Sequence, residues 1–147
     1  MRLKEIKTYD DLLRYTPINT YDTTLPQKYG CKVTYPLHLA KQNQSGSIRV
    51  YELCFPVQIR NSFNELKAII YSYNTPIGFV SAHGRIYVID KYKFRYSRTT
   101  STILSHFYNL ACYNVMVRII TTKDLFSIID FFELRVDKNT LEVFDND

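Results

Sequence analysis

The middle of the chain consists of short apolar segments that alternate with polar positions and are separated by turn-forming residues. Three of them have the length of a β-strand, at residues 65–73, 77–82 and 85–90. The last two are separated by His83-Gly84, and glycine readily adopts the positive φ angle that a tight hairpin requires. We therefore predict an antiparallel β-meander here. The alternation continues through residues 91–96, KYKFRY, so the strand pattern extends to them as well.

Two later segments have the periodicity of an amphipathic helix. In residues 100–112 the apolar positions recur at steps of three and four, at Ile103, Leu104, Phe107, Leu110 and Ala111. Residues 97–101, SRTTS, precede this helix, and their hydroxyl side chains are of the type that caps helix N-termini. A capping box at residues 121–124, TTKD, precedes a second apolar series, at Leu125, Phe126, Ile128, Ile129 and Phe132.

The N-terminal part begins with a third helix start signal. Residues 8–11, TYDD, form a capping box in which Asp replaces the usual Glu, and they predict a short helix that ends near Tyr15. Residues 16–30 contain Pro and Gly without periodicity, which indicates an ordered loop or an arm.

Further strands are predicted on both sides of the meander, at residues 31–39, 48–59 and 115–120. Pro36 and Pro56 predict a sheet edge or a bend, because proline donates no backbone hydrogen bond to a neighbouring strand. Residues 41–47, KQNQSGS, have the composition of a flexible loop.

These elements predict one α+β domain in which an antiparallel β-meander sheet is packed by two to three short helices. A chain of 147 residues suits a single domain with an ordinary core. Its successive parts are an N-terminal helix and arm at residues 1–30, mostly β structure at 31–96, a helix, a strand and a helix at 97–132, and a C-terminal hairpin at 133–147 with its turn at 137–140.

The composition excludes several classes of protein. Hydrophobic residues make up 46% and charged residues 22%, which is the balance of a globular domain. Charged or polar residues interrupt every apolar run before it reaches the length of a membrane span, and the N-terminus has no apolar export signal. The abundance of tyrosine, with 13 residues, favours a β-rich fold or a partner-facing surface.

The cysteines indicate a reducing cytoplasm, because Cys31, Cys54 and Cys112 are an odd and widely spaced set. Together with the three histidines, His38, His83 and His106, they form no closely spaced ligand pair. We therefore predict neither a metal site nor a cofactor.

The net charge of +5 is unevenly distributed. Residues 28–118 hold twelve basic and three acidic side chains, a balance of +9, whereas residues 119–147 hold three basic and seven acidic ones, a balance of −4. A basic block of this size favours an anionic partner, and nucleic acid is the commonest one in a cytoplasm. Two alternatives remain: the charge only keeps the surface soluble, or the acidic C-terminal residues fold back over part of the basic block.

The segment KYKFRY and the residues after it contain the most concentrated positive charge. On a strand the cations would point to one side and the aromatic rings to the other, with the rings buried against the helix at residues 100–112. We hypothesise an anion-binding strip with hydroxyl groups at its end: Arg85, Lys91, Lys93, Arg95, Arg98, Thr99 and Thr100. The alternative is that lysines on an exposed strand only prevent pairing with other chains.

No catalytic signature is present: the sequence contains no GxSxG, P-loop, GxGxxG or HExxH motif. His83 with Asp90 is a conceivable acid/base pair, although a histidine before a hairpin glycine is typical of a turn. Nothing in their spacing brings Glu52 and Glu65 together. We therefore predict no catalytic residue.

Three segments, YSYNTPIGFV at 71–80, GRIYVID at 84–90 and YSRTTSTILSHF at 96–107, resemble a family of small proteins from phages and other mobile elements of low-GC Gram-positive bacteria. The chemistry of that family is uncharacterised. The matching positions are Tyr71, Tyr73, Thr75, Pro76, Tyr96, Ser97, Thr99, Thr100 and Ser101, whereas His106 falls later than the histidine of the family pattern. The resemblance implies a phage-encoded accessory protein in the cytoplasm of the infected bacterial cell.

We therefore expect a non-enzymatic accessory protein that binds a host nucleoprotein, such as a CRISPR effector, or nucleic acid, and that inhibits host defence in the manner of an anti-CRISPR. It would not be a DNA mimic, because mimics are acidic and this chain carries +5. The alternative is a nucleic-acid-processing enzyme whose site is assembled from scattered Asp, Glu and His residues. The sequence leaves the oligomeric state open.

Overall fold

The computed structural model of the protein describes residues 2–16, 18–20, 37–42, 47–58, 65–73, 75–92, 94–95, 97–132 and 142–143. The helical elements are η1 (Leu3–Glu5), α1 (Tyr9–Tyr15), α3 (Arg98–Ala111) and α4 (Thr122–Phe132). The strands are β1 (Ile18–Thr20), β2 (Leu37–Gln42), β3 (Ile48–Val57), β4 (Leu66–Ser72), β5 (Thr75–Ser81), β6 (Ile86–Ile89), β7 (Phe94–Arg95), β8 (Val117–Ile120) and β9 (Glu142–Val143). The predicted α+β class in one domain is confirmed.

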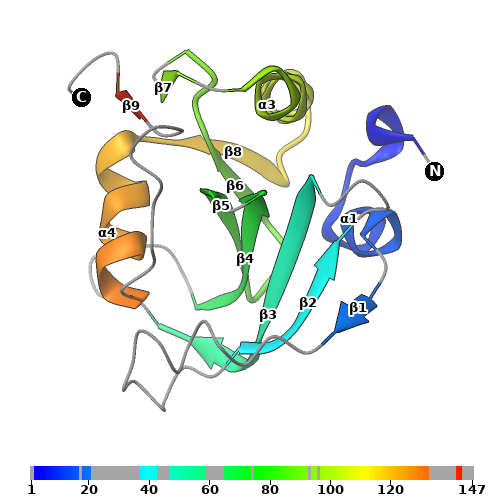
Figure 1. Cartoon of the computed structure of the whole chain (residues 1–147), viewed down its shortest axis with the longest axis vertical. Coiled ribbons are helices and arrows are strands. Elements are labelled where there is room, and N and C mark those ends of the chain that lie inside the picture. The colour runs from blue at the N-terminus through cyan, green and yellow to red at the C-terminus, as the bar shows by residue number, and fades with distance from the viewer. Residues whose placement is uncertain are drawn as a thin grey trace.

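Seven of the described strands form one sheet in the order β1-β2-β3-β4-β5-β6-β8 (Figure 1). Each strand from β1 to β6 is antiparallel to the next, which confirms the predicted meander in β4, β5 and β6. β8 instead pairs with β6 in parallel, from Ile86 opposite Val117 to Ile89 opposite Ile120. Two parallel neighbours need a crossover connection, and α3 lies in that connection.

The helices lie on both sides of this curved sheet. In Figure 1, α1 and α3 lie on one side of it and α4 lies on the other. Most of the predicted apolar series of both long helices is buried: Ile103, Leu104, Phe107 and Leu110 in α3, and Leu125, Ile128, Ile129 and Phe132 in α4. Ala111 and Phe126, the other two predicted positions, are partly buried against the same core. They join strand residues such as Tyr51 and Phe79 in one hydrophobic core. None of the helices in the described parts of the chain is long and apolar enough to span a bilayer.

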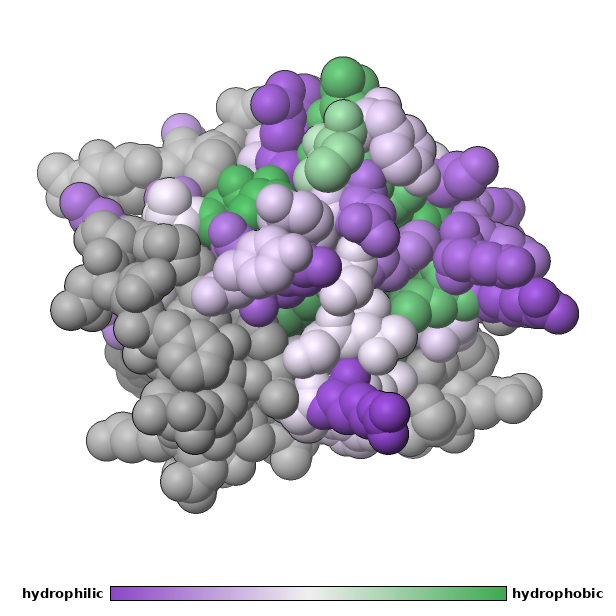
Figure 2. Space-filling model, turned by 90° about the horizontal axis from the view of Figure 1, so that it is seen from above, coloured by the Kyte–Doolittle hydropathy of each residue, from purple (hydrophilic) through white to green (hydrophobic). Residues whose placement is uncertain are grey.

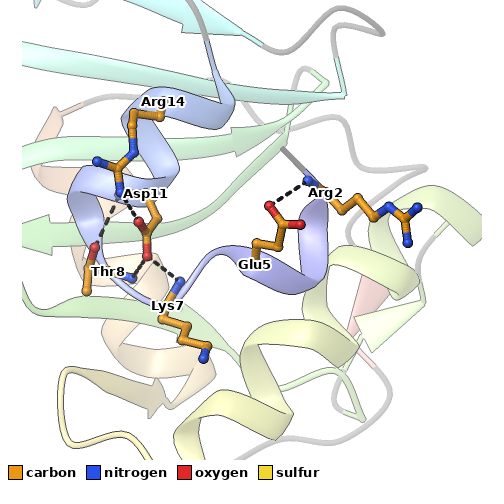
Figure 3. Close-up of polar contacts among 6 residues, drawn as sticks. All are labelled: Arg2, Glu5, Lys7, Thr8, Asp11 and Arg14. Carbon is orange, nitrogen blue, oxygen red and sulfur yellow. Dashed lines mark hydrogen bonds and ion pairs between the residues drawn. The ribbon is translucent and has the colours of Figure 1, made fainter.

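The capping box of α1 is confirmed. The Asp11 amide donates to Thr8 Oγ1 at 3.2 Å, and the Thr8 amide donates to Asp11 Oδ2 at 3.1 Å. The Asp11 carboxylate also accepts a hydrogen bond from the Lys7 amide at 3.0 Å and forms an ion pair with Arg14 (Figure 3). The Lys7 amide, followed by the Arg14 and Thr8 donors, holds the pKa of Asp11 below its ordinary value.

The other two predicted helix starts are also confirmed. Ser97 is the N-cap of α3, and its Oγ accepts a hydrogen bond from the Thr100 amide at 3.2 Å. At the start of α4, Thr121 Oγ1 accepts one from the Asp124 amide at 3.1 Å. The Asp124 carboxylate accepts one in return from the Thr121 amide at 3.4 Å. These bonds satisfy backbone donors that a helix N-terminus leaves unpaired.

Two glycines are required by the sheet. Gly84 has φ +86° in the connection between β5 and β6, which confirms its predicted role. Gly78 lies in β5, where an added Cβ would be 2.1 Å from the carbonyl oxygen of Tyr87 in β6. The two strands therefore approach each other too closely at this point for any side chain.

The N-terminal half differs in part from the prediction. β1 forms within the segment predicted as a loop or an arm and pairs with β2 at one edge of the sheet. Pro56 lies in β3 where its register with β4 shifts, between Glu52 and Val57, so the predicted bend is confirmed. Pro36 and most of the strand predicted at residues 31–39 lie outside the described residues. Lys41 and Gln42, predicted to be in a flexible loop, belong to β2.

The C-terminal end pairs with a distant segment. β9 is antiparallel to β7, with Arg95 opposite Glu142 and Phe94 opposite Val143. These two strands form a separate two-stranded sheet (Figure 1). The turn predicted at residues 137–140 lies outside the described residues.

Candidate nucleic-acid interface

The chain leaves the large sheet directly after β6. Asp90 Oδ1 accepts a hydrogen bond from the backbone amide of Tyr92 at 2.8 Å, the geometry of an Asx turn. Residues 91–92 are therefore in a turn, and β7 is a separate two-residue strand. The prediction that the meander continues through residues 91–96 is wrong, because the Asp90 side chain offers the backbone an alternative to the strand ladder.

Lys91 and Tyr92 lie together against α3, not on opposite faces of a strand. Lys91 Nζ is 4.8 Å from the ring centroid of Tyr92 and 5.1 Å from that of Tyr108. The two rings meet edge to face with their centroids 5.4 Å apart. Lys91 Nζ also donates a long hydrogen bond of 3.5 Å to Ser105 Oγ. We call Lys91, Tyr92, Ser105 and Tyr108 the Lys91 cluster.

The Lys91 cluster combines a positioned cation with an accessible ring. The negative faces of two tyrosine rings attract the ammonium group and hold it in place. Tyr92 is 62% exposed, so the expectation that its ring is buried against the helix is also wrong. The structure therefore places an aromatic surface and a positive charge side by side, which strand alternation would not.

The same side of α3 extends this surface toward the helix N-terminus. Arg98, Ser101, Ser105 and Tyr108 are spaced by three, four and three residues, so they share one side of the helix. Arg98 is exposed and lies seven residues before Ser105, which is about 10 Å along the axis. Within the described part of the chain, neither Arg98 nor Lys91 forms an ion pair with a carboxylate.

Figure 2 looks at the molecule from above the view of Figure 1, and therefore onto the end where α3 lies. Purple hydrophilic side chains are interleaved there with pale ones of intermediate hydropathy. Green hydrophobic atoms occupy only small areas between them in the coloured part of this face. Such a surface suits a polar or charged partner better than an apolar one.

Arg85 does not belong to this surface. It precedes β6, where the Ile86 amide donates to the carbonyl oxygen of Met116 at 2.7 Å. Lys91 follows the other end of β6, so a four-residue strand of about 13 Å separates the two cations. The guanidinium Nε of Arg85 is buried.

The two predicted threonines have different roles. Thr99 is exposed in the first turn of α3, so it can contribute to the surface. Thr100 is 6% exposed. Its hydroxyl group is hydrogen-bonded to Ser72 Oγ at 2.5 Å and to Ser97 Oγ at 3.1 Å. Thr100 thus fixes α3 to β4 and does not face a partner.

Of the remaining two members of the predicted strip, only one lies among the described residues. Lys93 lies outside the described residues. The backbone of Arg95 is in β7, directly opposite Glu142 of β9. The acidic C-terminal segment therefore folds back onto the basic block at this one position. This was one of the two alternatives that the charge distribution left open.

The candidate catalytic residues do not converge. His83 is exposed in the turn before β6, whereas Asp90 follows β6, so the whole strand separates them. Glu65 is exposed at the start of β4, and Glu52 lies beside the buried Tyr9 of α1. Burial and the Glu52 charge raise the pKa of the Tyr9 phenol. No group of three His, Cys, Asp or Glu side chains suited to a metal ion occurs among the described residues.

His106 has a structural contact. Its Nε2 donates a hydrogen bond of 2.7 Å to the carbonyl oxygen of Ile6, since a carbonyl can only accept. Asn114 Nδ2 donates similarly to the carbonyl oxygen of Lys7 at 3.0 Å. These two bonds join the N-terminal segment to α3 and to the residues that follow it.

Tyr92, Ser105 and Tyr108, which the structure places around Lys91, were not singled out from the sequence. Two signals were present in the sequence: the Asp at position 90, which starts turns readily, and the polar spacing at residues 98, 101, 105 and 108. The contact between them depends on how the turn at residues 90–92 meets α3, which no local pattern specifies.

A family model matches residues 19–124, from just after the start of β1 into the first turn of α4. The chain belongs to a family of unknown function, DUF8033. The matched region includes the whole Lys91 cluster and Arg98. No curated protein and no solved structure matches the chain.

Proposed function

We propose that this protein is a non-enzymatic binding protein that holds nucleic acid, alone or within a host nucleoprotein, through the Lys91 cluster and Arg98. The observation that supports it most is the position of the Lys91 ammonium group, fixed over two tyrosine rings without a described carboxylate partner. A cation placed in this way is available to a phosphate, and the loss of conformational freedom on binding is small because it is already ordered.

The charge distribution supports the same proposal. The balance of +9 in residues 28–118 produces a long-range attraction for polyanions that does not depend on their sequence. Arg98 adds an exposed cation at the first turn of α3, where backbone amides also favour an anion. Thr99 supplies a neighbouring hydroxyl group.

The resemblance to small phage proteins supports a biological setting. In that setting the protein is an accessory factor that acts in the cytoplasm of the infected cell. It inhibits host defence by binding a nucleoprotein such as a CRISPR effector. It would bind the guide RNA or target DNA of such a complex through its cations. The positive charge is opposite in sign to that of a protein that imitates DNA.

Affinity purification of the tagged protein from host cells, with and without nuclease treatment, tests the proposal. We expect nucleic acid or a nuclease-sensitive complex to be recovered with the wild type and to be lost in the double variant Lys91→Glu/Arg98→Glu. Arg118→Glu is the matched control, because Arg118 is an exposed cation on β8 outside the proposed surface. Equal recovery by the double variant and the control, with both folded, would refute the proposed surface.

A further inference from the structure

We propose that the Lys91 cluster selects single-stranded nucleic acid, with one unpaired base stacked on Tyr92 and an adjacent phosphate held by Lys91. This inference rests on the proposed function and adds the class of ligand to it. Single-stranded DNA and single-stranded RNA both supply the groups that this site would recognise, namely an accessible base face next to a phosphate.

The exposure of Tyr92 is the first argument. Three tyrosines are strongly exposed among the described residues: Tyr73 at 46%, Tyr92 at 62% and Tyr113 at 71%. Of these three, Tyr92 alone has a lysine ammonium group over its ring. Proteins that hold single strands combine an aromatic platform with a cation in this way, and each stacked base contributes measurably to affinity.

The rigidity of Tyr92 is the second argument. Its backbone amide donates a hydrogen bond to Asp90 Oδ1, and its ring contacts the ring of Tyr108 edge to face. Tyr108 is in turn part of α3, whose N-cap and inner face are fixed to the rest of the protein. A ring that is ordered before binding loses little entropy when a base stacks on it.

The charges around the ring are the third argument. Lys91 and Arg98 lie on the same side of α3, so a strand that stacks on Tyr92 has cations on its path toward the helix N-terminus. Asp90 is the one acidic residue of this turn, and its Oδ1 accepts the Tyr92 amide while the carboxylate keeps its charge. Lys91 and Arg98 outnumber this carboxylate, so the balance of charge near the ring favours a phosphate.

Stacking on Tyr92 is possible for a single strand but not within a duplex, because in a duplex both faces of each internal base are already stacked. Tyr92 can then contribute only to single-strand binding, whereas Lys91 contributes to both. This difference can be measured by fluorescence anisotropy with labelled thymidine and uridine oligomers of about 15 nucleotides, the length that one small domain covers at most. A duplex and an oligomer of abasic sites with the same number of phosphates serve as controls.

We expect Tyr92→Leu to weaken binding of the thymidine oligomer by about 5- to 100-fold and to leave duplex and abasic binding within about twofold. Tyr92→Phe keeps the ring and should bind as the wild type does. Tyr113→Leu removes a tyrosine that is even more exposed, just beyond the other end of α3, and should have no effect. The uridine oligomer shows whether DNA and RNA are both accepted.

The outcomes separate this inference from the proposed function. If the wild type binds duplex, abasic and single-stranded oligomers alike and Tyr92→Leu changes none of them, the stacking site is refuted and the nucleic-acid-binding proposal stands. If the folded wild type binds no oligomer even at low salt, both are refuted. An equal loss in Tyr92→Leu and Tyr92→Phe would show that the hydroxyl group, and not the ring face, makes the contact, which also overturns the inference.

Discussion

The hydroxyl oxygens of Ser72 and Thr100 lie 2.5 Å apart in the interior, where the end of β4 meets the first turn of α3. Thr100 also receives a hydrogen bond from the N-cap residue, Ser97. Two segments that are far apart in the sequence, 71–80 and 96–107, therefore meet at this point. The contact fixes the start of α3, and with it the position of Arg98 relative to the Lys91 cluster.

Thr100→Val tests this contact. The variant keeps the shape of the side chain but leaves the buried Ser72 hydroxyl without its partner, so we expect a loss of about 1–3 kcal/mol in the free energy of unfolding. Urea denaturation measures it, and Thr100→Ser, which retains the hydroxyl, is the control with the smaller loss. Valine and wild-type proteins of equal stability would show that the hydroxyl pair contributes nothing.

The Asp11 carboxylate predicts a loss of stability in acid. Its pKa is lowered in the folded protein, so its ionised form stabilises the fold at pH values above its unfolded pKa of about 3.9. This contribution disappears as the pH falls further, through the folded pKa. Asp11→Asn should therefore reduce stability at pH 7 and make the acid limb of the stability curve shallower. Chemical denaturation between about pH 2 and 7 measures the free energy of unfolding of both proteins. The same pH dependence in Asp11→Asn and the wild type would contradict the lowered pKa of Asp11.

Thr8→Ala tests the other half of the same capping box. Removal of the hydroxyl that accepts the Asp11 amide should cost about 1 kcal/mol. Thr8→Ser keeps the acceptor and should cost much less. Thermal unfolding followed by circular dichroism compares the three proteins, and equal midpoints for alanine and serine would argue against the cap.

The two structural glycines should respond differently to alanine. At Gly78 the new methyl group would meet the Tyr87 carbonyl oxygen at 2.1 Å and force β5 and β6 apart, which we expect to cost about 3 kcal/mol or more. At Gly84 the methyl group would meet no atom within 4 Å, and only the positive φ angle would be strained, at about 1–2 kcal/mol. The reverse order in urea denaturation would disprove the close approach of the two strands.

Salt dependence tests which cations contact phosphate. For single strands the slope of log K against log salt concentration is about −0.7 per neutralised phosphate, so Lys91→Met should reduce its magnitude by about 0.7. Arg98→Met should act similarly, whereas Arg85→Met at the other end of β6 should leave the slope unchanged. An effect of Arg85 equal to that of Lys91 would restore the extended strip that the sequence predicted.

Local signals in the sequence were enough for much of the fold. The capping residues Thr8, Ser97 and Thr121 each begin a helix at the predicted place, because their bonds involve residues only three positions away. The meander of β4, β5 and β6 follows from alternation and from turn residues such as Gly84. Neighbouring strands along the chain need no long-range information to pair.

The remaining features depend on contacts between distant segments. The parallel pairing of β8 with β6 and the pairing of β7 with β9 could not be inferred from alternation, since it does not specify a partner. At the candidate site, the Asp90 side chain interrupts a pattern that otherwise favours a strand. This single turn changes which cations share a surface, joining Lys91 to α3 and leaving Arg85 apart.

The parallel pair also has a consequence for synthesis of the protein. Until the ribosome has released residues 117–120, the outer edge of β6 has no neighbour. Its unpaired backbone N–H and C=O groups, beside apolar side chains, can then pair with another nascent chain. Fragments of the chain that stop before this point should therefore aggregate.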